Sequence, residues 1–112
     1  MRPDSPPDFQ QTDLFGGTGT VDIWNIKREN MLPFTTALWC SLEPKGSVGR
    51  HRQQEDAEVI LCISGDGLAK VGQQIHRLQT GALVYLPFGE VLSLHNSSST
   101  ESLSYVIIKA QK

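Results

Sequence analysis

The chain has 112 residues and a formal net charge of −2, with acidic and basic residues interspersed along it. This length allows one domain with a single hydrophobic core, and the absence of a basic stripe interleaved with aromatic residues argues against a nucleic-acid partner. No apolar run approaches the roughly 18 residues of a membrane span, and no apolar signal segment begins the chain, so we expect a cytoplasmic protein.

The first residues favour a loose arm rather than a packed element. Residues 1–13 are rich in Pro, Asp and Gln, which predicts a flexible N-terminal arm, and we assign residues 14–112 to one domain. A glycine cluster, Gly16-Gly17-Thr18-Gly19, precedes an alternating strand at 21–26. A phosphate-binding loop would need a helix after it, so we expect a turn or bulge here.

Short strands with frequent turn signals account for the rest of the chain. No segment shows helical periodicity over ten residues, whereas β-branched and aromatic runs end repeatedly at Gly and Pro, as at Pro44-Lys45-Gly46. This pattern predicts an all-β sandwich or barrel. We expect the further strands at 35–43, 47–53, 58–64, 68–71, 74–78, 82–86, 91–96 and 102–110.

Two groups of residues stand at characteristic spacings. His51 and Gln53 are two positions apart, Glu58 follows Gln53 after four residues, and Gly65 follows Glu58 after six more. A second group lies about thirty residues on and comprises Gly81, Pro87, Gly89 and Asn96. These groups resemble the two sequence blocks of the cupin superfamily. The resemblance covers about residues 35–110 and implies a double-stranded β-helix, or jelly-roll barrel.

The chain departs from the cupin blocks at two metal-ligand positions. In the family, two His and one Glu of the first block join a His of the second block around one divalent metal. Gln53 and Leu92 stand at two of the His positions here. The resemblance therefore implies a weakly held divalent transition metal on His51, Gln53 and Glu58. His95 lies three residues from Leu92 and faces the opposite side of a regular strand, so only a bulge would turn it inward.

The same residues predict a ligand pocket that works without metal. Leu92 would make one wall apolar, and His51, Gln53 and Glu58 would supply a few convergent polar groups. Burial beside an apolar wall disfavours ionisation of a carboxyl group, which suits Glu58 to acid–base chemistry with His51 as its partner. We therefore predict a small-molecule-binding barrel protein, either an accessory protein or an acid–base enzyme with Glu58 and His51 as catalytic residues.

Two other interpretations stay open at this point. One is a metal-dependent enzyme, similar to a dioxygenase or an isomerase, with the metal on the three first-block residues. The other is a barrel whose interior polar groups only hydrogen-bond one another and which serves assembly or regulation. The sequence does not decide whether the protein is an enzyme.

The chain has two cysteines. Cys40 and Cys62 lie within apolar runs, which favours free, buried thiols.

The resemblance implies a homodimer that pairs through sheet edges, with the strand at 21–26 crossing to the partner. Trp24, Trp39 and Phe34 suit either a core or an interface, and the sequence does not divide them.

Overall fold

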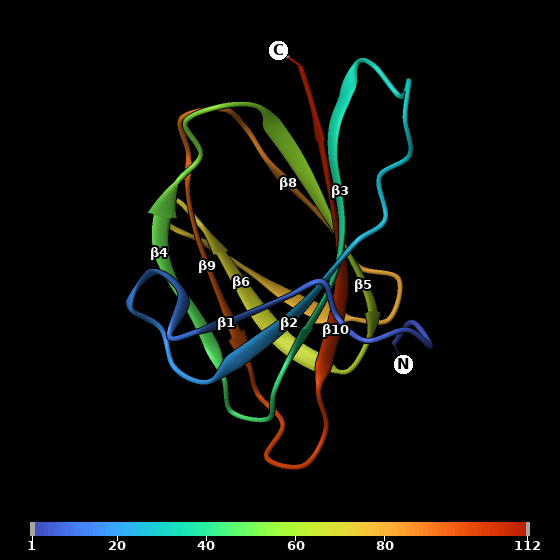
Figure 1. Cartoon of the computed structure of the whole chain (residues 1–112). Coiled ribbons are helices and arrows are strands. Elements are labelled where there is room, and N and C mark those ends of the chain that lie inside the picture. The colour runs from blue at the N-terminus through green and yellow to red at the C-terminus, as the bar shows by residue number, and fades with distance from the viewer. Residues whose placement is uncertain (1, 112) are drawn as a thin grey trace.

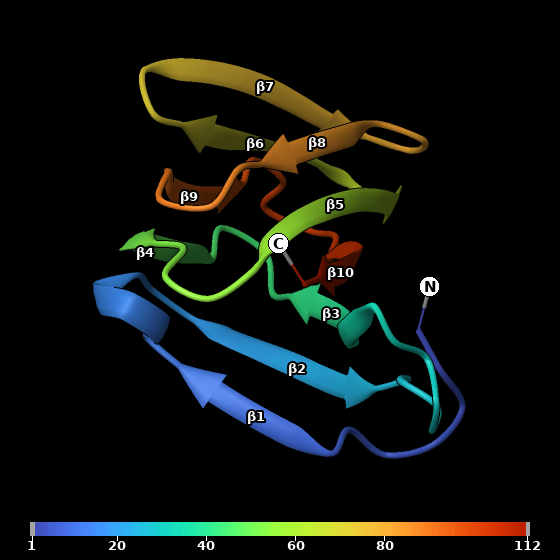
Figure 2. The ribbon, with the colours of Figure 1, turned by 90° about the horizontal axis from the view of Figure 1, so that it is seen from above.

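In a computed structural model of the chain, residues 2–111 are described, and they form two antiparallel sheets that face each other (Figures 1 and 2). The large sheet consists, in spatial order, of β1 (Phe9–Thr12), β2 (Thr20–Asn25), β3 (Phe34–Leu42), β10 (Leu103–Ala110), β5 (Ala57–Ser64) and β8 (Leu83–Leu86). The small sheet consists of β4 (Ser47–Arg52), β9 (Val91–Asn96), β6 (Asp66–Val71) and β7 (Gln74–Gln79). The predicted all-β jelly-roll class is confirmed.

The core lies between the two sheets because the strands alternate in polarity. In β9, Leu92, Leu94 and Asn96 are buried while His95 is exposed. Alternate residues of a strand point to opposite faces, so one face of each sheet is apolar and closes over the other sheet. His95 therefore faces away from the interior, as its spacing from Leu92 predicts. Within residues 2–111, no helix is long and apolar enough to cross a membrane.

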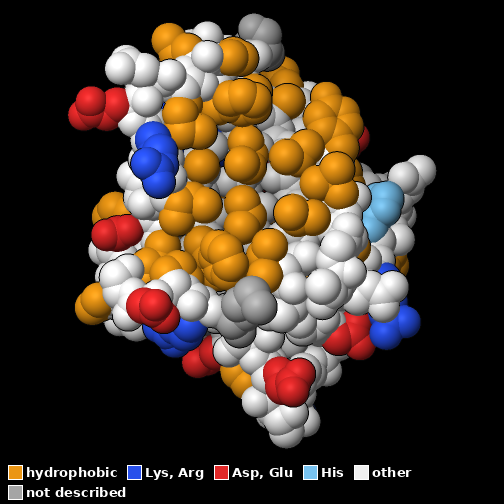
Figure 3. Space-filling view, turned by 90° about the vertical axis from the view of Figure 1, so that its right-hand side faces the viewer, with side chains coloured by type: hydrophobic (Ala, Val, Ile, Leu, Met, Phe, Trp, Pro, Cys, Tyr) orange, Lys and Arg blue, Asp and Glu red, His pale blue; other side chains and the backbone are white. Residues whose placement is uncertain are grey.

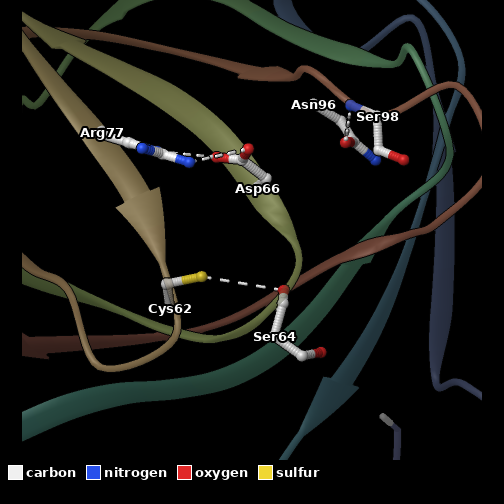
Figure 4. Close-up of polar contacts among 6 residues, drawn as sticks. All are labelled: Cys62, Ser64, Asp66, Arg77, Asn96 and Ser98. Atoms are coloured by element: carbon white, nitrogen blue, oxygen red, sulfur yellow. Dashed lines mark hydrogen bonds and ion pairs between the residues drawn. The ribbon is translucent and has the colours of Figure 1, made fainter.

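Asn96, the last residue of the second cupin block, ties two loops together. Its Nδ2 donates to the backbone oxygens of Leu42, Glu43 and Glu101 at 3.1, 3.0 and 2.9 Å. Its Oδ1 accepts from the amide of Ser98 at 3.0 Å (Figure 4). The side chain is fully buried, and its four hydrogen bonds link the turn between β3 and β4 to the loop after β9. Asn96 thus has a structural role at the end of the barrel opposite His51.

The N-terminal residues lie against the outer face of β2. The guanidinium of Arg2 lies 4.8 Å from the ring centroid of Trp24, and the indole Nε1 of Trp24 donates to the carbonyl of Ser5 at 2.8 Å. Residues 9–12, within the arm predicted as flexible, pair with β2 as strand β1. The flexibility of this arm and a domain boundary at residue 14 stay predictions.

The two cysteines are free and buried, as predicted. Cys40 on β3 and Cys62 on β5 are both register partners of Tyr105, on opposite sides of β10. Two strand spacings separate their Cα atoms by roughly 9–10 Å, which is beyond the reach of a disulfide. The Cys62 thiol instead donates to the carbonyl of Ser64 at 3.7 Å (Figure 4).

Candidate functional site

A cavity of about 350 Å³ lies between the sheets and receives side chains from both. Its polar end lies where β4 finishes and β5 begins, and it is bordered by the short 3-10 turn η1 (Leu14–Gly16). The three residues predicted as site residues, His51, Gln53 and Glu58, all line this cavity, and so does Leu92. Their catalytic and metal-binding roles stay predictions.

A bulge in β4 sets the direction of His51. Val48 pairs with Leu94 and His51 pairs with Leu92, so two residues of β4 stand opposite one residue of β9. This extra residue shifts the alternation, and Val48 and His51 therefore both line the cavity although they are three positions apart. The imidazole Nδ1 lies 2.9 Å from the carbonyl oxygen of Gly49. Because a carbonyl only accepts, this contact requires a proton on Nδ1, and Nε2 is an acceptor whenever the ring is neutral.

Phe15, which the sequence did not single out, covers one face of His51. Their ring centroids are 4.0 Å apart and the ring planes differ by 14°. Phe15 reaches this position from the η1 turn, where its φ is 53°. The backbones of the turn and of β4 meet at two glycines. A Cβ on Gly49 would lie 1.9 Å from the Phe15 carbonyl oxygen, and a Cβ on Gly17 would lie 2.2 Å from the Ser47 carbonyl oxygen.

This close approach explains the glycine cluster. Thr18 and Ser47 exchange backbone hydrogen bonds of 3.1 and 2.8 Å beside the two glycines. The cluster therefore forms the turn that the sequence predicts, and the turn lies beside β4 in both ribbon views (Figures 1 and 2). Its contact with the site was missed because Gly49 carries no side chain that would signal a close backbone neighbour.

Gln53 and Glu58 form a buried pair. The Gln53 Nε2 donates to the Glu58 Oε1 at 2.5 Å, and the Gln53 Oε1 accepts from the backbone amide of Glu55 at 3.1 Å. Only 5% of Gln53 and 4% of Glu58 is exposed. Backbone bonds from Gln53 to Glu90 and from Gly89 to Gln53 hold the segment in place. Gln53 is thus fixed with its amino group toward the carboxyl group.

Burial is the main influence on Glu58 and raises its pKa above the ordinary value. Three groups oppose this effect: the positive charge of Lys109, which is its register partner on β10, the hydrogen bond from Gln53, and the charge of His51. The result is a carboxyl group that holds its proton to higher pH than an exposed glutamate. When protonated, such a group can donate a hydrogen bond, and a raised pKa favours its use in proton transfer.

The donor set fits poorly with a metal ion. The Gln53 oxygen, the only atom of that side chain able to ligate, faces the Glu55 amide, and the apolar Leu92 stands directly opposite His51. Among residues 2–111, no group of three or more His, Cys, Asp or Glu side chains is placed to hold a metal. The predicted weak metal site on His51, Gln53 and Glu58 stays a prediction.

The remaining walls of the cavity are mostly apolar. Leu92, Leu94 and Val48 come from the small sheet and are almost fully buried. Tyr105 and Cys40 come from the large sheet and hydrogen-bond each other. Burial raises the pKa of the Cys40 thiol to about 12, with the Glu58 charge as a smaller cause. Cys40 is thus an unreactive thiol that packs as a small apolar side chain. No spacing pattern in the sequence marks Tyr105.

The fold and this cavity define a small jelly-roll barrel with a half-polar interior site. The sequence profile of the cupin domain family matches residues 38–109, so the chain belongs to the cupin family. No curated protein matches it in sequence.

Solved structures of the same fold share little sequence with this chain. A Thermotoga maritima protein described as a predicted oxalate decarboxylase has a TM-score of 0.88 and 18% identity over 99% of this chain and 97% of that chain. A cupin-like protein from the same organism has a TM-score of 0.79 and 20% identity over 99% and 82%. The cupin domain of Schizosaccharomyces pombe Cnp3 has a TM-score of 0.74 and 12% identity over 93% and 69%. Similarity at this level shows the fold alone.

Proposed function

We propose that the protein binds a small organic molecule in the cavity between its sheets. The observation that supports this most directly is that the cavity has apolar walls and one polar end. Leu92 and its neighbours form apolar walls, and the Gln53–Glu58 pair and His51 lie together at one end. Ligand pockets are built in this way, with apolar walls for affinity and a few polar groups for orientation.

The size and the lining of the cavity indicate the class of ligand. The cavity volume of about 350 Å³ is at the small end of the range of ligand pockets, roughly 300–1,000 Å³. The Glu58 carboxyl group offers an O–H donor when it is protonated, and His51 with its proton on Nδ1 offers Nε2 as an acceptor when the ring is neutral. A small, largely apolar molecule with a neighbouring carbonyl and hydroxyl group matches both. Its apolar part would lie against Leu92 and Leu94.

We propose Glu58 as the proton-transfer group if the ligand reacts, with His51 as its partner. The raised pKa of the carboxyl group places its protonated and ionised forms closer in free energy at neutral pH, as a general acid or base requires. Gln53 holds the carboxyl group in one orientation through the hydrogen bond to Oε1. An accessory binding role and an enzymatic role share these contacts, and turnover of the bound compound would distinguish them.

A thermal-shift screen with small hydroxy-carbonyl compounds tests the proposal. A ligand that binds only the folded state raises the melting temperature, and the rise grows with ligand concentration. Leu38→Phe adds volume inside the cavity and should remove the rise, whereas Leu68→Phe, at an exposed position on β6, should keep it. A rise that survives Leu38→Phe would mean that the compound binds elsewhere and would contradict the proposal.

A further inference from the structure

Lys109 brings a positive charge to the wall of the cavity. Tyr105, Ile107 and Lys109, at alternate positions of β10, line the interior, and Lys109 is half-buried. Val106 and Ile108 lie between them and face outward, on the side of the molecule where hydrophobic side chains form a continuous area with charged ones at its border (Figure 3). The strand therefore directs its one charged residue inward, which reverses the usual alternation.

The Lys109 ammonium has no ion-pair partner in the described part of the chain. The ion pairs among residues 2–111 join Arg2 to Asp22 and Arg77 to Asp66. Lys109 is the register partner of Glu58, and its charge lowers the pKa of that carboxyl group, but burial has the larger effect and keeps the pKa raised. Glu58 therefore does not neutralise Lys109, whose charge stays available to a negative group of a ligand.

Two other charged residues border the cavity, and both are exposed. The Arg52 guanidinium donates to the carbonyl oxygen of Gly89 at 2.5 Å, and Glu55 stands three residues further along the chain. Water and salt screen charges at such positions. Lys109 is more deeply placed than either of them. A partly buried cation loses part of its hydration, so it gains more from an opposite charge than an exposed one does.

We propose that the ligand of the cavity is a small 2-hydroxy carboxylate whose carboxylate group binds Lys109, an inference that rests on the proposed function. The Glu58 O–H and the Lys109 ammonium both donate to the carboxylate, and the neighbouring hydroxyl group donates to Nε2 of His51. The apolar remainder of the molecule lies against Leu92 and Leu94. A neutral hydroxy-carbonyl compound lacks only the charge pair, so it binds more weakly.

Mandelate and its neutral amide, mandelamide, are matched probes that differ in charge and hardly in shape. Isothermal titration of the unmodified protein should give a dissociation constant about 10-fold lower for mandelate, the usual effect of a charge-assisted hydrogen bond. This preference should shrink in high salt, because screening weakens a charge pair. Lys109→Met keeps a side chain of similar length without the charge. Mandelate should then bind no more tightly than mandelamide, whose affinity should not change.

Lys70→Met removes a lysine at an exposed position of β6 and serves as the control, which should keep the preference for mandelate. Melting temperatures check that both variants are folded. Equal affinity of the unmodified protein for the two probes would overturn the role of Lys109 and leave binding in the cavity intact. A preference that survives Lys109→Met, or that high salt does not reduce, would overturn it too. If neither probe binds while other hydroxy-carbonyl compounds raise the melting temperature, the proposed function stands and the carboxylate class is wrong.

Discussion

The imidazole of His51 lies flat against the phenyl ring of Phe15, with ring centroids 4.0 Å apart and ring planes within 14° of parallel. This contact joins two parts of the chain that are far apart in sequence. The hydrogen bond from Nδ1 to the Gly49 carbonyl oxygen fixes how the ring is turned within its own plane. His51 is therefore held by the turn on one side and by its own strand on the other, which orients Nε2 before any ligand arrives.

Removing the stacked ring should loosen His51. Phe15→Ala is expected to lower the free energy of unfolding by about 1 kcal/mol, the usual size of an aromatic pair contribution. Urea unfolding measures the change. Phe9 is the matched control, since both phenylalanines are 55% exposed and Phe9 makes no aromatic contact with a described residue. An equal loss in Phe9→Ala would show that the stack with His51 contributes nothing specific.

The raised pKa of Glu58 should make stability depend on pH. The unfolded chain releases this proton near the ordinary pKa of 4.5, while the folded protein retains it to a higher pH. The folded state thus binds more protons between these two values, and stability falls as the pH rises through this window. Each unit of pKa difference corresponds to about 1.4 kcal/mol.

Glu58→Gln removes this titration and should flatten the dependence. Relative to the unmodified protein, the variant should be more stable at about pH 8 than at about pH 4, by an amount set by the pKa difference. Urea unfolding at both pH values gives the comparison. Glu29→Gln removes an exposed carboxylate from the loop before β3 and serves as the control. A constant difference at the two pH values would contradict a raised pKa for Glu58.

Restoring the family ligands should create a metal site. Leu92 is the register partner of His51, so a histidine at position 92 would place its ring beside the His51 ring. Gln53→His combined with Leu92→His is expected to bind Co²⁺ or Ni²⁺ at least about 100-fold more tightly than the unmodified chain. Isothermal titration measures both proteins. No gain in affinity would show that positions 51, 53, 58 and 92 do not converge as described.

Loss of the Asn96 side chain should destabilise the barrel without removing any residue that lines the cavity. Asn96→Ala leaves three carbonyls and one amide without their side-chain partner, at a cost of roughly 2–4 kcal/mol by the usual value of about 1 kcal/mol for each bond. Thermal unfolding measures the loss. Asn25→Ala, on the exposed end of β2, should cost a few tenths of this. Equal losses in the two variants would refute the structural role of Asn96.

Much of the fold could be predicted because it depends on local pattern. Alternation of apolar and polar residues marks strands such as β9, and it correctly placed Leu92 inside and His95 outside. The short strand β1 was missed because Phe9–Thr12 is exposed along its whole length and carries no alternation. Its pairing with β2 is made by backbone hydrogen bonds and by exposed polar contacts such as that of Gln10 with Asp22, which give no apolar pattern in the sequence.

The site could be predicted only in part, since several of its features are contacts between distant segments. The spacing of His51, Gln53 and Glu58 identified three residues that line the cavity. Three other features depend on which segments meet in space. They are the bulge in β4, the stacking of Phe15 on His51, and the contact between Tyr105 and Cys40.

Binding of a cavity ligand to Glu58→Leu tests the central claim most directly. Isothermal titration would compare the unmodified protein with Glu58→Leu and with the remote control Glu29→Leu, using the compound that stabilises the fold most strongly. Leucine keeps the approximate volume of the side chain but has no hydrogen-bonding group, whereas glutamine would keep a donor. Loss of the carboxyl group should therefore weaken binding by about 10- to 100-fold, and Glu29→Leu should bind as the unmodified protein does. Unchanged affinity in Glu58→Leu would contradict the assignment of this cavity as the binding site.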